Sequence, residues 1–125
     1  WMLARLNATS DTVNRSLREH RLHEAADAIW KFFWDDFCDW YLELKKPRLT
    51  SEARLDWDVL LYTYEASLRL LHPMMPFLTE ELWQMLAAAG SEPERSISLA
   101  AYPQFDASRT DAEAETAMAD LQGII

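Results

Sequence analysis

The sequence predicts an all-α protein, an antiparallel helical bundle of four main helices plus a truncated fifth. Half of the 125 residues are apolar and only two are glycine, a composition typical of a packed helical domain. Apolar residues recur at helical spacing in long segments, and Pro47, Pro73 and Gly90 stand where that spacing stops. We therefore expect one domain over residues 1–125. The uncapped Trp1 at its start suggests a domain excised from a longer protein.

The first two helices are predicted from their apolar faces. From Trp1 to about His20 the apolar residues are Leu3, Leu6, Val13 and Leu17, with Ser10 filling the gap. The second segment has a stronger stripe, with Trp40 near its middle, so we expect Trp40 to be a core residue. This helix is predicted to be central and to end at Lys45-Lys46-Pro47. Its stripe comprises Leu22, Ala26, Ile29, Phe33, Phe37, Trp40 and Leu44, widened by Trp30, Trp34 and Tyr41.

The remaining helices follow from turn and cap signals. Thr50 or Ser51 is expected to cap a third helix, which continues through Leu55, Val59, Tyr62, Ala66 and Leu70. Pro73 should end that helix near Leu71 or His72, and Thr79 should cap a fourth helix that runs to Ala89. A loop with a short extended piece at 97–100 is expected next. A final helix is expected to start near Thr110 or Asp111 and to be still running at Ile125.

Several function classes find no support in the sequence. It has no apolar run long enough to span a membrane and no signal-peptide pattern at its start. The single cysteine, Cys38, cannot form an intrachain disulfide, which fits a reducing compartment, and we expect a cytoplasmic protein. A structural thiol is favoured over a catalytic one at Cys38, since no histidine lies at a readable spacing from it.

No catalytic machinery is readable in these residues. There is no glycine-rich phosphate loop, no serine nucleophile motif and no zinc spacing, so we expect no catalytic site, no metal and no cofactor here. His20, His23, Glu24 and Asp27 could face a metal only on a continuous helix, and a solvated helix junction is the simpler interpretation. Asp35, Asp36 and Asp39 are interpreted as the solvated side of the second helix.

The charge distribution indicates where a polyanion could bind. The net charge is −9, but residues 1–50 balance eight basic against eight acidic residues, and residues 51–125 carry the whole excess. The first half can therefore meet phosphates while the second half turns away. The second half offers only scattered arginines. Ordinary solvated charges remain the alternative for the candidate phosphate contacts, which are Arg15, Arg18 and Arg21, then Lys45, Lys46 and Arg48.

Two stretches resemble a known family. "FFWDDFCDWYLELKKPRL" and "LLHPMMPFLTEELW" are similar to the helical anticodon-binding domain of class I aminoacyl-tRNA synthetases. "WMLARLN" and "SISLAAYP" fit the same pattern, so the resemblance covers nearly the whole chain. Within the class, the run "CDWYLE" followed by "KP" is most similar to the valyl enzymes. The double-proline corner is shared more widely across the class.

The resemblance implies an anticodon-binding module without a catalytic site of its own. The parent enzyme would ligate valine to its tRNA by using ATP, and its catalytic and editing domains would lie elsewhere in the parent chain. The implied partner is a valine-specific tRNA, held by stacking and edge hydrogen bonds to its bases and by basic side chains on its phosphates. The alternatives are a related isoleucyl or leucyl enzyme, or a helical protein–protein interaction domain.

Overall fold

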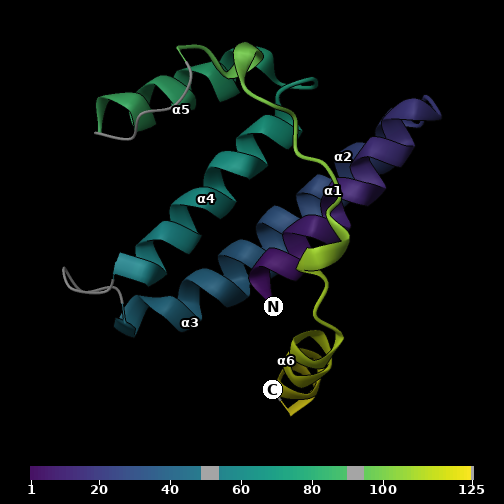
Figure 1. The fold of residues 1–125 in the computed structure, drawn as a ribbon, viewed down its shortest axis with the longest axis vertical. Coiled ribbons are helices and arrows are strands. Elements are labelled where there is room, and N and C mark those ends of the chain that lie inside the picture. The colour runs from purple at the N-terminus through teal and green to yellow at the C-terminus, as the bar shows by residue number, and fades with distance from the viewer. Residues whose placement is uncertain (49–53, 90–94, 125) are drawn as a thin grey trace.

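The computed structural model describes residues 1–48, 54–89 and 95–124, and the regular structure in these ranges is helical (Figure 1). The expected all-α fold class is thus confirmed. The expected caps at Thr50 or Ser51 and the stop at Gly90 lie outside the described residues. In chain order the elements are α1 (Met2–Arg18), α2 (Leu22–Lys31), the π-helical segment η1 (Phe32–Leu42), α3 (Glu43–Lys45), η2 (Lys46–Arg48), α4 (Arg54–Leu71), α5 (Pro76–Ala88), η3 (Ile97–Leu99), η4 (Ala107–Arg109) and α6 (Ala112–Ile124).

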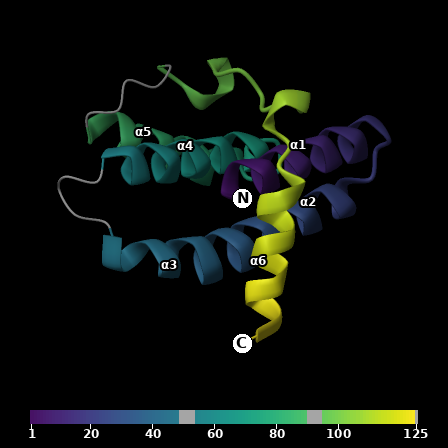
Figure 2. The ribbon, with the colours of Figure 1, turned by 60° about the horizontal axis from the view of Figure 1, so that its bottom comes forward.

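The helices form a bundle from which one element projects. α2, η1 and α3 follow one another without a break and make a single long rod, antiparallel to α1 (Figures 1 and 2). α1 packs against α2, η1 and α4, and α4 also packs against α5. α6 extends away from the other helices in both views. None of the helices in the described ranges combines the length and hydropathy needed to cross a membrane.

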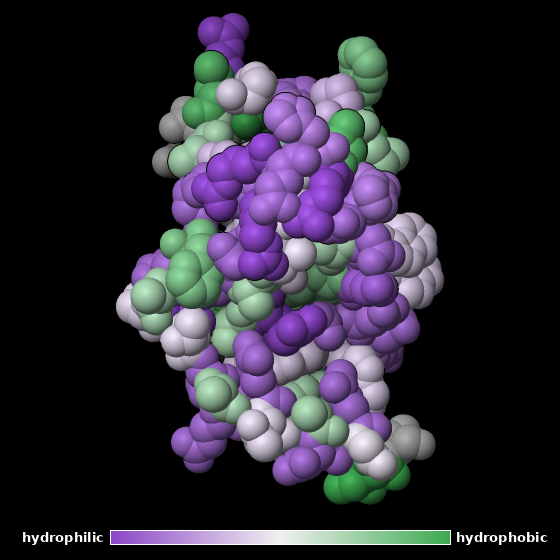
Figure 3. Space-filling model, turned by 90° about the vertical axis from the view of Figure 1, so that its right-hand side faces the viewer, coloured by the Kyte–Doolittle hydropathy of each residue, from purple (hydrophilic) through white to green (hydrophobic). Residues whose placement is uncertain are grey.

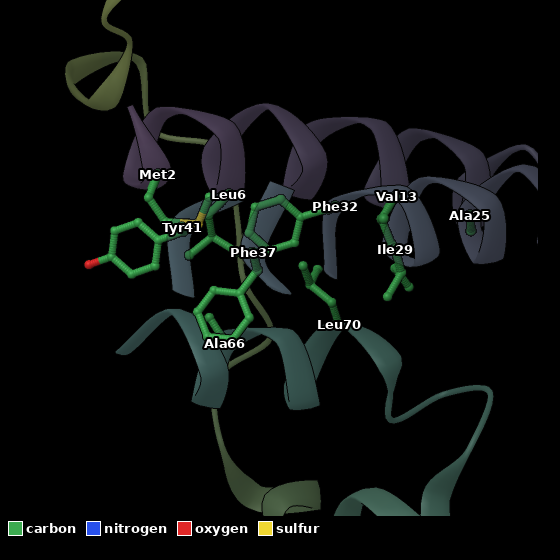
Figure 4. Packing of buried hydrophobic residues seen from close by; sticks show 10 residues of the cluster. All are labelled: Met2, Leu6, Val13, Ala25, Ile29, Phe32, Phe37, Tyr41, Ala66 and Leu70. Atoms are coloured by element: carbon green, nitrogen blue, oxygen red, sulfur yellow. The ribbon is translucent and has the colours of Figure 1, made fainter. Parts of the chain in front are cut away.

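The main core lies between α1, the α2–η1 rod and α4 (Figure 4). Ser10 fills the gap in the α1 stripe as expected, since it is buried and its hydroxyl donates to the carbonyl of Leu6 at 2.8 Å. A smaller cluster of Leu68, Trp83 and Ile97 joins α4 to α5 and η3. The buried members of the main core are Met2, Leu6, Val13, Ala25, Ile29, Phe32, Phe37, Tyr41, Ala66 and Leu70.

The buried face of the long rod differs from the predicted stripe. An α-helical period predicts burial of Phe33, Phe37 and Trp40, whereas the structure buries Phe32, Phe37 and Tyr41 and leaves Trp40 only half-buried. The reason is the π-helical hydrogen bonding of η1, which adds residues to each turn and so moves successive core positions apart by five and four residues. The expected core role of Trp40 is therefore wrong. The stripe's ends, Leu22 and Leu44, are also exposed.

The proline corner closes differently from the prediction. α5 begins at Pro76, which occupies the first turn, where its missing N–H costs nothing. Thr79 is therefore not the cap. It is fully buried within α5, and its hydroxyl donates to the carbonyl of Met75 at 2.9 Å and lies 2.7 Å from Nδ1 of His72. His72 itself follows the last residue of α4, as expected.

For the segment after α5, the predicted extended piece is wrong and the predicted start of the final helix is confirmed. Residues 97–99 form the 3₁₀ turn η3 instead of an extended piece. The start of the final helix is confirmed, because the carboxylate of Asp111 accepts a hydrogen bond from the backbone N–H of Ala114 at 2.9 Å, the geometry of an N-cap.

Candidate nucleic-acid interface

A left-handed residue makes the sharp corner between α1 and α2. His20 has a φ of 58°, a conformation that non-glycine residues adopt rarely. Its N–H donates to the carbonyl of Leu17 at 3.1 Å, and the N–H of Arg21 donates to that of Ser16 at 2.8 Å. These two bonds are a Schellman motif, which ends a helix. α1 and α2 are therefore not one continuous helix, and the condition for a shared metal-facing side at His20 and Glu24 is not met.

Arg15, Arg18 and Arg21 lie at or near this corner, in three different environments. Arg15 is half-exposed, with Nη1 3.9 Å from the carboxylate of Asp11 one turn earlier. Arg21 lies beyond the end of α1 and is held by Glu19 and by Glu24, the latter at 3.1 Å.

The side-chain contacts of Arg18 differ from those of Arg15 and Arg21. It is an exposed residue in the last turn of α1, and its side chain forms no ion pair or hydrogen bond with the described parts of the chain. An unpaired guanidinium can bind a phosphate without first breaking an internal contact. Arg18 is therefore the arginine of the corner best prepared to meet a polyanion.

The second basic cluster lies at the other end of the long rod. Lys45 binds Asp56 of α4 and sits over the ring of Tyr41 with its Nζ 5.6 Å from the ring centroid. Lys46 binds Glu43. Arg48 belongs to η2, and its side chain lies outside the described part of the structure. Both described lysines are thus neutralised by carboxylates, so this cluster is less free to bind phosphate than the corner.

The structure keeps the two basic clusters apart. The α1–α2 corner and α3 lie at opposite ends of the rod (Figure 1). The corner faces the side of the molecule drawn in Figure 3, whose upper part is mostly hydrophilic, while hydrophobic residues also show in its middle and lower parts. A hydrophilic surface of this kind suits a wet, charged interface such as one with nucleic acid.

Two arginines of the acidic half were predicted to be scattered, but the structure brings them to one hollow. Arg69 of α4 and Arg109 of η4 both line the hollow beside Tyr62. Arg69 donates to the carbonyl of Ala101 at 2.8 Å, and Arg109 donates to the hydroxyl of Tyr62 at 2.6 Å. No sequence pattern signals this pairing, because α4 brings one arginine and a turn 40 residues later brings the other. Carboxylates lie beside both, Glu65 at 4.0 Å from Arg69 and Asp106 at 3.5 Å from Arg109.

The other titratable residues that the sequence singled out lie in surroundings that fit a structural role. Partial burial, and secondly Asp39, raise the pKa of the Cys38 thiol, so its reactive thiolate form is disfavoured. Asp36 does not belong to a solvated acidic patch, because it is largely buried and binds Arg5 at 2.9 Å. Within the described ranges, histidine, cysteine and acidic side chains nowhere gather in a group that could hold a metal ion.

Comparison with known proteins assigns the chain to a family. The family model for the anticodon-binding domain of tRNA ligases matches residues 1–125. The chain is 50% identical over 125 residues to the valine–tRNA ligase of Solibacter usitatus and 48% identical over 126 residues to that of Thermotoga maritima. Each match covers 100% of this chain and 14% of the relative. The chain thus spans about one seventh of the length of the curated relatives that it matches.

Proposed function

The chain belongs to the anticodon-binding domain family of tRNA ligases, and on that premise we propose that it binds the anticodon region of a valine tRNA. The observation that carries the proposal is the match of the family model to all 125 residues. The names of the relatives support valine over the isoleucine and leucine alternatives, since the Solibacter and Thermotoga proteins are both valine–tRNA ligases. The guanidinium of Arg18, which has no ion-pair partner among the described residues, supports an RNA partner over a purely protein partner.

In this proposal the chain contributes recognition and not bond formation. Valine would be joined to the tRNA, with ATP consumed, by catalytic and editing domains in the rest of a longer parent protein. That protein would act in the cytoplasm, where tRNA is charged for protein synthesis. The described residues would bind phosphates at the α1–α2 corner, and unpaired anticodon bases would be read by stacking and by hydrogen bonds to their edges.

The test is a binding titration of the parent protein with two transcripts that differ only in the anticodon. Fluorescence anisotropy of an end-labelled valine tRNA gives the affinity, and the same transcript with a substituted anticodon is the matched control. We expect the control to bind about tenfold or more weakly, because each mismatched base costs about 1–3 kcal/mol. Affinity should also fall steeply between about 50 and 200 mM salt, as phosphate contacts require.

Equal affinity for the two transcripts at every salt concentration would contradict anticodon recognition. A salt-independent affinity would contradict phosphate contacts. The two results together would favour the alternative of a helical protein–protein interaction domain.

A further inference from the structure

An apolar groove runs between the long rod and the proline corner. One wall is formed by Trp30 and Trp34 of α2 and η1, and the other by Met74, Met75 and Leu78, where α4 turns into α5. Its volume is about 740 Å³, within the range of about 300–1,000 Å³ that is typical of ligand-binding pockets. The groove is separate from the basic residues of the α1–α2 corner.

The walls of the groove expose large apolar side chains to water. Trp30 is 64% exposed and Trp34 51% exposed, and their rings stack in parallel with centroids 5.6 Å apart. Met75 and Leu78 on the facing wall are 45% and 47% exposed. A contiguous apolar surface of this kind marks an interaction site in a stable protein. Methionine side chains adapt readily to a partner's shape.

The charges of the groove argue against nucleic acid as its occupant. The charged residue among those that line it is Asp27, a carboxylate, which binds Lys31 at 2.8 Å. The hydroxyl of Ser67, also in the lining, donates to the carbonyl of Thr63 at 2.7 Å. A phosphate backbone would therefore meet a carboxylate and apolar side chains. The stacked tryptophans suit the apolar face of a protein segment instead.

We propose that this groove receives an amphipathic helix from a part of the same polypeptide outside residues 1–125. The relatives are about seven times longer than this chain, so most of such a polypeptide lies outside the described bundle. A helix fits beside the helical wall of the rod and the start of α5, because side-chain ridges pack into helical grooves. A tethered segment also has a high effective concentration, so it fills the groove more readily than a free partner does. The proline corner then has a second role, since its methionines form one wall of an interdomain contact.

The test is thiol protection in the full-length polypeptide. Ala26 is exposed and lines the groove, so Ala26→Cys places a small reporter thiol there. The rate of its reaction with a maleimide is measured by peptide mass spectrometry in the native protein and in urea. We expect the introduced thiol to react about tenfold or more slowly in the native protein than in urea, because a tethered helix covers it most of the time.

Two matched sets of substitutions identify the cause of the protection. Trp30→Lys with Trp34→Lys should make the reporter thiol reactive, whereas Met85→Lys should not, since Met85 is 57% exposed and does not line the groove. Circular dichroism checks that each variant stays folded. An unprotected reporter thiol, or protection that survives the double substitution, would overturn the proposal.

Two further outcomes would also overturn it. Protection that grows with protein concentration would identify a second copy of the chain as the occupant, and protection that needs added tRNA would identify RNA. These outcomes are independent of the anticodon titration, so failure of one proposal leaves the other standing.

Discussion

The guanidinium of Arg5 binds the carboxylate of Asp36 through both Nε and Nη2, each at 2.9 Å. This pair fastens α1 to the π-helical segment η1 across 31 residues of sequence. The Asp36 side chain is only 14% exposed, and that of Arg5 is 38% exposed. A carboxylate so far removed from water depends on its partner, so the pair is a structural link between two elements of the core.

Arg5→Ala should therefore destabilise the fold more than an arginine substitution at the surface. We expect a loss of about 1–3 kcal/mol in the free energy of unfolding, because Asp36 is left largely buried without its partner. Urea unfolding followed by circular dichroism measures the loss. Arg15→Ala is the control, since its pair with Asp11 is exposed and 3.9 Å long, and we expect less than about 1 kcal/mol there. Equal losses at Arg5 and Arg15 would show that the Asp36 pair adds no more stability than the exposed pair of Arg15 with Asp11.

Trp83 and Trp40 should differ in their contribution to stability. Trp83 is 1% exposed and lies in the cluster with Leu68 and Ile97, so Trp83→Ala should cost about 3–5 kcal/mol through the cavity it leaves. Trp40 is half-buried, so Trp40→Ala should cost clearly less. Urea unfolding of the two variants checks the order. A larger loss at Trp40 than at Trp83 would support the predicted stripe over the π-helical face.

Alkaline pH should weaken the fold through Tyr102. Burial raises the pKa of Tyr102 to about 12, while an unfolded tyrosine titrates near about pH 10. Between these two values the unfolded state loses the proton and the folded state keeps it. The stability contributed by the neutral side chain is therefore complete below about pH 10 and is lost as the pH rises toward about 12.

The variant Tyr102→Phe separates this effect from other alkaline effects. The hydroxyl of Tyr102 donates to the carbonyl of Leu70 at 2.9 Å, so its removal should cost about 1 kcal/mol near neutral pH. Between about pH 10 and pH 12 the difference between the two proteins should shrink, because the wild type loses a contribution that the variant lacks at every pH. Urea unfolding at these pH values gives the difference. A constant difference would show that Tyr102 does not control the alkaline loss.

The long rod shows why the sequence predicted a helix correctly and its buried face wrongly. The apolar residues from Ile29 to Tyr41 are so dense that both an α-helical and a π-helical period find large side chains to bury. The hydrogen-bond pattern is decided by packing against α1 and α4, which a local pattern does not contain. Phe37, common to both periods, is buried in either case.

The position of the candidate interface stays a prediction from the charge count, and the structure adds contacts that the sequence does not show. Counting charges places most of the basic residues in the first half, and the structure locates Arg15 and Arg18 in the last turn of α1. The pair of Arg15 with Asp11 follows from helical spacing within α1, whereas the ion pairs of Arg21 with Glu19 and Glu24 depend on the chain reversal at the corner. The separation of Arg18 from Arg21 depends on the left-handed His20, which no apolar spacing signals.

Thr79→Val tests the corrected role of this residue at the proline corner. A threonine that caps a helix is usually exposed to solvent. Thr79 is instead fully buried, and its hydroxyl contacts His72 and donates to the carbonyl of Met75. Valine preserves the shape and removes the hydroxyl, so we expect a loss of about 1–3 kcal/mol, because the ring nitrogen of His72 loses this partner while the carbonyl of Met75 keeps the backbone N–H of residue 79. Thr116→Val is the matched control, because that hydroxyl makes a similar bond to Ala112 at an exposed site. An equal loss in the two variants, measured by urea unfolding, would argue against the buried contact.

Reversing the charge of the α1–α2 corner should weaken tRNA binding without unfolding the protein. Arg15→Glu with Arg18→Glu puts two carboxylates where phosphates are proposed to bind, and neither residue belongs to the buried core. We expect the affinity for valine tRNA to fall and the slope of log affinity against log salt to decrease by about one for each phosphate that is no longer bound. Arg54→Glu with Arg95→Glu makes the same charge change at exposed positions of the acidic half and should alter binding much less.

The single variants assign the contact within the corner. Arg18 has no ion pair in the described parts of the chain, whereas Arg15 has Asp11 beside it. Arg18→Glu should therefore account for most of the loss, because Arg15 must give up an existing attraction to bind a phosphate. Anisotropy titrations at two salt concentrations, with circular dichroism to verify the fold, distinguish the variants. If the double reversal leaves both the affinity and the salt slope unchanged, the phosphates lie elsewhere on the bundle. The hollow that holds Arg69 and Arg109 would then be the next surface to test, because it is the place where the acidic half brings two arginines together.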